Sequence, residues 1–141
     1  MNLTIGNSKE VREEKLPNLE GLKKCLNGLK ENKVDCYLII DNKENDYLQC
    51  AGANDKFTVE LRTPKNDTFG HWRLGQLKQS KVWEEIDCHV GPISVLQHEV
   101  FSFETICSIL TFYFEKSKMM EETEEGLRKM YIFRNITKMF D

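Results

Sequence analysis

The chain has 141 residues, of which 40% are hydrophobic and 30% charged, and its formal net charge is -3. This composition is ordinary for a globular chain of about one domain, and no apolar run approaches the roughly 20 residues that cross a bilayer. The acidic balance argues against a general affinity for nucleic acid, because phosphate binding needs a concentrated basic face.

The first residues and the cysteines bear on the compartment. Residues 1–15 lack the apolar core of a secretory signal peptide and are rich in charge. The five cysteines are an odd number without paired spacing, which favours reduced and buried thiols. We therefore expect a cytoplasmic protein in which residues 1–15 are weakly ordered and residues 16–141 form a single domain.

The first periodic segment covers residues 16–33 and predicts a helix. Its leucines recur at spacings of three, four and three, which places them on one helical face. They are Leu19, Leu22, Leu26 and Leu29. Gly21 and Gly28 each cost a helix about 1 kcal/mol relative to alanine, so we expect this helix to depend on docking its leucine face.

The hydrophobic period then changes to two, which is typical of strands. Apolar side chains alternate along three segments separated by short polar turns. These segments are residues 34–40, 47–51 and 57–62. Because short turns join antiparallel neighbours, the pattern predicts an antiparallel meander, and we expect Pro64 to end its third strand and a loop to follow.

The rest of the chain adds further strands and a second helix. Four later segments are interpreted as strands, and the sequence does not give their order in the sheet. They are residues 71–79, 82–90, 92–98 and the closing segment from Tyr131.

Residues 101–116 show a helical apolar face, with Ser102 as the N-cap. Residues 115–129 are compatible with a loose helix or a mobile loop. The expected fold is therefore α+β: a mainly antiparallel sheet of about five to six strands, with an N-terminal helix and a second amphipathic helix packed on it.

Candidate metal and catalytic residues are sparse. Cysteine and histidine occur without the spacing of known metal sites, so we expect neither a metal nor a cofactor. Cys88, His98 and Glu99 can be combined on paper into a hydrolase site, although no nucleophile elbow or glycine-rich turn accompanies them. The simpler interpretation places His71, His89 and His98 on the surface of strands.

Glu60 and Arg62 close the third strand of the meander and share one of its faces. One interpretation is a solvated sheet face with a modest ion pair, since exposed pairs contribute about 0–1 kcal/mol. The other makes both residues part of a polar contact surface.

The order of these features resembles a known family. Residues 47–52 read Tyr-Leu-Gln followed by two small residues and glycine, residues 57–62 read Phe-Thr-Val-Glu-Leu-Arg, and residues 101–114 form a helix ending in Phe-Tyr-Phe. This arrangement is similar to the bacterial polymorphic-toxin immunity proteins of immunity protein family one, and the resemblance spans residues 34–116.

The resemblance implies a specific activity. Members are small cytoplasmic α+β proteins, neither catalytic nor cofactor-dependent, that bind a toxin encoded beside them and protect the producing cell. The toxin often attacks nucleic acid. The family's acidic hairpin position corresponds to Glu60 and its basic position to Arg62, whereas Tyr131 and Phe133 stand where members often carry a tryptophan.

We therefore expect the partner to be a cognate toxin C-terminal domain, bound by occlusion, with no direct contact to nucleic acid or membrane. An acidic inhibitor is steered toward a basic cleft. The candidate toxin-binding residues are Asp41, Glu44, Asp46, Glu60, Arg62, Trp72, Glu121, Glu122, Glu124 and Glu125, and Trp83 is a further candidate anchor. The protein is expected to be a monomer or weak dimer. The alternatives are a small cysteine-dependent hydrolase using Cys88 and His98, and a non-catalytic adaptor subunit that self-associates through a strand edge.

Overall fold

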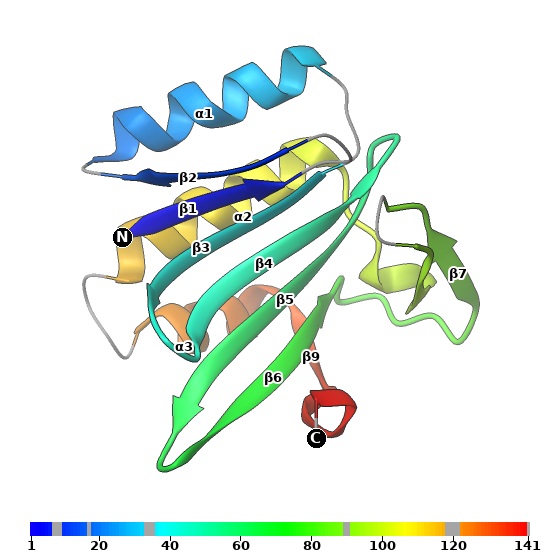
Figure 1. The fold of residues 1–141 in the computed structure, drawn as a ribbon. Helices are drawn as coiled ribbons and strands as arrows, with labels where there is room; N and C mark the ends of the chain where they lie inside the picture. Colours follow the sequence, from blue (N-terminus) through cyan, green and yellow to red (C-terminus); the bar gives the residue numbers. More distant parts are fainter. Residues whose placement is uncertain (7–9, 17, 33–35, 89–90, 118–121, 141) are drawn as a thin grey trace.

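A seven-stranded antiparallel sheet dominates the computed structural model, with helices packed behind it and a small two-stranded sheet beside it (Figure 1). The structure describes residues 1–6, 10–16, 18–32, 36–88, 91–117 and 122–140. None of the helices in these ranges is long and apolar enough to span a membrane.

The large sheet has the strand order β2-β1-β3-β4-β5-β6-β9. Its strands are β1 (Asn2–Gly6), β2 (Val11–Lys15), β3 (Cys36–Lys43), β4 (Asp46–Ala53), β5 (Lys56–Lys65), β6 (Thr68–Gly75) and β9 (Ile132–Asn135). The small sheet pairs β7 (Trp83–Ile86) with β8 (Ile93–Leu96). The helices are α1 (Leu19–Asn32), α2 (Phe103–Lys116) and α3 (Glu122–Met130), and the 3-10 turns are η1 (Gln97–Glu99) and η3 (Thr137–Phe140).

The α+β class is confirmed, but the expected strand number was too low. The main error lies in residues 1–15, which were expected to be weakly ordered: Asn2–Gly6 forms β1 and Val11–Lys15 forms β2. Leu3 and Ile5 of β1 are buried, and Leu3 pairs in register with Ile40 of β3. This strand is held by a partner far along the chain, and composition near the N-terminus does not reveal such pairing.

The predicted three-strand meander is confirmed as β3, β4 and β5, and β6 extends it as the next strand in sequence order. Pro64 does not end its strand, because β5 continues to Lys65 and pairs with β6 in a tight hairpin. The last pair between β4 and β5 joins Tyr47 to Arg62. Pro64 lies beyond that pair, so no strand on that side requires the N–H that proline lacks. The expected loop after Pro64 is therefore the turn of a hairpin.

The two expected helices form as their patterns indicate. Ser102 caps α2 by accepting a hydrogen bond from the Thr105 amide, and Ile106 and Leu110 on its inner face are fully buried. Leu22 and Leu26 bury the leucine face of α1 in the same core. Residues 122–130 adopt the helical alternative as α3, which Leu127 anchors in the core. The closing strand is confirmed as the edge strand β9 beside β6.

Alternation along the strands gives the large sheet two different faces. The face toward the helices is apolar, with Leu38, Leu48, Val59 and Leu74 buried in the core. The opposite face carries polar residues of β5 and β6, and η3 and the β7–β8 hairpin lie beside it (Figure 1). Residues next to each other on one strand therefore serve different environments.

Two glycines give opposite predictions for stability. Gly28 is exposed in α1, and no described atom lies within 4 Å of a Cβ added there, so Gly28→Ala should raise the free energy of unfolding by about 0.5–1 kcal/mol. A Cβ at Gly52 would collide with the Lys56 carbonyl oxygen and lie 2.8 Å from the Phe57 Cα. Gly52→Ala should therefore lower the free energy of unfolding by about 1–3 kcal/mol. Urea unfolding of both variants checks the pair, and a stabilising Gly52→Ala would contradict this packing.

Candidate functional site

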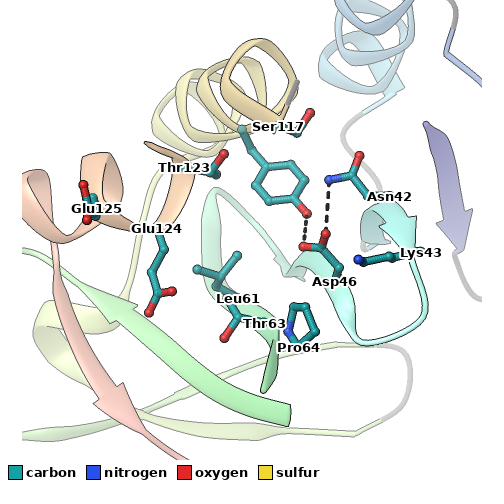
Figure 2. A pocket seen from close by; sticks show the side chains of 11 residues that line it. Asn42, Lys43, Asp46, Leu61, Thr63, Pro64, Ser117, Thr123, Glu124 and Glu125 are labelled. Atoms are coloured by element: carbon teal, nitrogen blue, oxygen red, sulfur yellow. Dashed lines mark hydrogen bonds between the residues drawn. The ribbon is translucent and has the colours of Figure 1, made fainter. Parts of the chain in front are cut away.

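Two acidic segments far apart in the sequence meet at one cavity of about 630 Å³ (Figure 2). Its described lining residues are Asn42, Lys43 and Asp46 from the β3–β4 hairpin, Leu61, Thr63 and Pro64 from β5, Tyr113 and Ser117 from the end of α2, and Thr123, Glu124 and Glu125 from α3. The cavity thus lies on the helix-facing side of the sheet, between the β3–β4 hairpin, β5, the end of α2 and α3.

The β3–β4 turn positions Asp46 at the cavity. Asn45 adopts φ 60°, a left-handed conformation that asparagine tolerates better than most residues, and β4 begins at the next residue. Asp46 Oδ1 accepts a hydrogen bond of 3.3 Å from the Tyr113 hydroxyl of α2. Strand alternation places Tyr47 on the other face, so Asp46 faces the helices.

The Tyr113 hydroxyl reports the electrostatics at the base of the cavity. Burial raises its pKa well above the ordinary value, and the negative charges of Asp46 and Asp41 raise it further. The hydroxyl therefore keeps its proton and serves Asp46 as a donor. Because both carboxylates raise the pKa of Tyr113, this end of the sheet has a negative local potential.

The α3 side of the cavity supplies a hydroxyl and two carboxylates. Thr123 is only 8% exposed, and its Oγ1 is buried without a hydrogen-bond partner in the described structure. Glu124 receives two hydrogen bonds from Arg128, and both go to the same oxygen, Oε1. Glu125 is exposed. Lys43 is the single basic residue among the described residues that line the cavity.

The structure brings together only some of the candidate toxin-binding residues. Asp46, Glu124 and Glu125 share the cavity, and Glu44 is exposed at the adjacent turn. Asp41 instead accepts a 3.3 Å hydrogen bond from the Asn2 side chain. Of the remaining acidic candidates, Glu122 begins α3 and Glu121 lies outside the described residues.

Glu60 and His71 contradict the expectation of a solvated sheet face. Glu60 is 8% exposed and His71 is 1% exposed, so neither lies on the surface as the simpler interpretation required. Glu60 Oε1 lies 2.6 Å from His71 Nε2, and Glu60 Oε2 accepts a 3.2 Å hydrogen bond from Arg73. Arg62 donates from Nε to His71 Nδ1 at 2.9 Å. These four residues form a buried polar network on the face opposite the cavity.

The hydrogen bonds of this network determine the state of His71. A guanidinium group can only donate, so Nδ1 of His71 must accept from Arg62 and the ring proton lies on Nε2, facing Glu60. Both ring nitrogens are then bound within the fold. This arrangement holds β5 and β6 together and leaves neither nitrogen available to take a proton from an outside molecule.

Aromatic rings cover the outer side of the network. The Arg62 guanidinium lies 3.8 Å from the centre of the Phe69 ring and 4.8 Å from that of Phe140 in η3. The His71 ring centre is 4.1 Å from the Phe140 ring centre. Thr137 adds a side-chain acceptor for the His71 amide at 2.9 Å. The C-terminal turn η3 therefore shields these charges from water.

The three residues of the hydrolase alternative do not converge. In the β7–β8 register Trp83 pairs with Leu96 and Ile86 pairs with Ile93, so Cys88 lies beyond one end of this hairpin and His98 beyond the other. Glu99 accepts hydrogen bonds of 2.8 and 2.9 Å from Arg134 of β9. His98 Nδ1 accepts from the Ser80 amide. His89 lies outside the described residues.

The two tryptophans have different environments. Trp72 is half-buried at the β6–β9 edge, with the Arg128 guanidinium 4.7 Å from its ring. Trp83 is 61% exposed on the β7–β8 hairpin, and Arg134 lies 5.5 Å from its ring. Trp83 therefore presents more surface than Trp72, which is one of the candidate toxin-binding residues.

Within the ranges that the structure covers, no group of three His, Cys, Asp or Glu residues could hold a metal ion. Comparisons with protein-family models, curated proteins and solved structures returned no match. The resemblance to immunity proteins therefore stays a prediction drawn from the residues quoted above.

The buried network predicts an acid-sensitive contribution to stability. Burial alone would raise the pKa of Glu60, but the hydrogen bond from His71 and the charge of Arg73 outweigh it and hold this pKa below the ordinary 4.5. A lowered pKa gives stability that is complete above the unfolded-state value and is lost as pH falls through the folded-state value. Glu60→Gln should lower the free energy of unfolding by about 3 kcal/mol at pH 7, because it leaves Arg73 buried without a charged partner.

The control for this prediction is its pH dependence. Guanidinium unfolding between pH 7 and pH 3 should show the difference between parent and Glu60→Gln shrinking as the pH falls below 4.5. Glu85→Gln on exposed β7 provides a matched control that should change little. A difference that stays constant down to pH 3 would show that the Glu60 charge is not the cause.

The unpaired hydroxyl of Thr123 predicts a stabilising substitution. A buried hydroxyl without a partner costs a fold about 1–3 kcal/mol, and valine has almost the same shape. Thr123→Val should therefore raise the free energy of unfolding by about 1 kcal/mol in thermal or urea unfolding. Thr105 Oγ1 accepts a hydrogen bond from Ser102, so Thr105→Val should have the opposite effect. A loss of stability in Thr123→Val would reveal a partner for that hydroxyl within the fold.

Proposed function

We propose that this chain is a cytoplasmic immunity protein that binds the toxin domain encoded beside it and neutralises it by occlusion. The observation that supports this proposal best is the meeting of Asp46 with Glu124 and Glu125 around one cavity. These residues come from the two acidic segments that the sequence offers as contact elements.

The physical argument rests on charge and shape. A toxin that handles nucleic acid presents a basic cleft, and an acidic inhibitor gains a faster association rate toward it through long-range attraction. A concave site gives a partner side chain a place to become buried at the centre of an interface, where binding energy concentrates. Covering the toxin in this way requires no covalent chemistry.

The adaptor alternative depends on strand edges that pair with another copy. The edge strand β2 reads Val-Arg-Glu-Glu-Lys, and Arg12, Glu13 and Lys15 are exposed along it. Charged side chains on an edge strand disfavour pairing with a second sheet. We therefore keep the monomeric or weakly dimeric inhibitor as the proposal.

Co-expression tests the function directly. Cells producing the toxin domain encoded beside this chain should survive when the chain is co-expressed, and the two proteins should co-elute in size-exclusion chromatography. Death of these cells despite soluble expression of the chain, together with separate elution of the two proteins, would contradict the proposal.

Steering by the acidic cavity predicts a kinetic effect. Glu124→Lys combined with Glu125→Lys should slow association with the toxin domain by about tenfold at low salt and change the dissociation rate less. Glu13→Lys combined with Glu85→Lys changes the net charge equally at exposed positions on β2 and β7 and serves as the control. Stopped-flow or surface plasmon resonance measures both rates. Equal association rates for the two double variants would exclude steering by this site.

A further inference from the structure

We propose that the cavity between the β3–β4 turn and α3 receives the guanidinium group of an arginine side chain. This inference rests on the proposed function for the source of that arginine, which is the toxin partner. Binding of the group itself follows from the cavity and can be measured on the isolated protein.

Thr123, a residue that lines the cavity, carries an unsatisfied polar atom. Thr123 is 8% exposed and lines the cavity, and its Oγ1 has no hydrogen-bond partner among the residues described. Buried hydroxyls are nearly always paired in folded proteins. Oγ1 itself is shielded from solvent in this structure, and a rotation of the Thr123 side chain would turn it toward the cavity as an acceptor for a group that enters from outside. As a hydroxyl, Oγ1 can accept a hydrogen bond from a cationic N–H.

Carboxylates predominate among the charged residues that line the cavity. Asp46, Glu124 and Glu125 line the same cavity. Lys43 is the single basic residue among the described lining residues, and it is exposed. Arg128 donates both of its hydrogen bonds to Oε1 of Glu124, so this pair does not use Oε2. The C-terminal end of α2 at Ser117 adds the negative pole of a helix dipole. A cation is therefore favoured over an anion.

The cavity suits the guanidinium group of arginine better than the ammonium group of lysine. Leu61, Pro64 and the buried Tyr113 give the cavity apolar walls between its carboxylates. A guanidinium group is planar and weakly hydrated, so its faces tolerate apolar contact while its edge donates several hydrogen bonds. A lysine ammonium is strongly hydrated on all sides and would lose more solvation in the same place. The acceptors come from two separate elements, Asp46 from β4 and Thr123 and Glu124 from α3 (Figure 2), which suits a forked donor.

An NMR titration of the isolated protein tests the inference. Nα-acetyl-L-arginine amide should shift backbone amides of residues 42–46, 61–63 and 123–125 in a saturable manner. The citrulline analogue has the same shape without the charge and should bind at least about tenfold more weakly, because charge-assisted hydrogen bonds are lost. The lysine analogue should also bind more weakly than the arginine compound. Equal binding of arginine and citrulline analogues, or shifts confined to other residues, would overturn the proposal.

Variants separate a binding role from a structural one. Thr123→Val, which should fold more stably than the parent, should weaken binding of the arginine compound several-fold. Asp46→Asn retains an acceptor for the Tyr113 hydroxyl, and it should weaken binding of the arginine compound about tenfold. Glu85→Gln on β7 is the matched control and should bind like the parent. Unchanged binding in both Thr123→Val and Asp46→Asn would contradict a guanidinium in this cavity.

The result can be told apart from a failure of the proposed function. If the protein binds the arginine compound but does not protect cells from the neighbouring toxin, the immunity role is contradicted and the arginine site is supported. Protection of cells by a protein that does not bind the arginine compound would contradict this site and leave the immunity role standing.

Discussion

The antiparallel register of β5 with β4 and β6 determines which charges of this protein reach a surface. Along β5, Leu61 and Thr63 face the helices and line the cavity, whereas Glu60 and Arg62 project from the opposite face. Glu60 pairs with Arg73 across β6, and Arg62 pairs with His71. A shift of one residue in this register would exchange the two faces. The buried network, which fixes the register through charged hydrogen bonds, therefore also fixes the cavity.

Local patterns were sufficient to predict the elements that depend on local physics. The apolar face and N-cap of α2, the leucine stripe of α1 and the β3–β5 meander follow from periodicity and turns, and the structure contains them. The strand β1 was missed because Leu3 and Ile5 give only a short alternation, and the strand exists through pairing with β2 and β3. Pairing between distant segments is not encoded in any local window.

The candidate site was predictable in its charge and not in its geometry. The acidic segments at 41–46 and 121–125 are visible in the sequence, but their meeting depends on how α3 packs after α2. A threonine inside a charged helix gives no sign that its hydroxyl is buried and unpaired. Glu60 was read as exposed because its partners, His71 and Arg73, are identified only by the cross-strand register.

We propose that the protein acts by covering a toxin partner with the surface around this cavity. Hydrogen–deuterium exchange of the protein alone and in complex with the neighbouring toxin domain tests it most directly. We expect slower exchange in the complex at the amides of residues 42–46 and 122–125, with little change on β7 and β8. Protection confined to the β7–β8 hairpin or to the outer face of α1, with residues 42–46 unchanged, would contradict it.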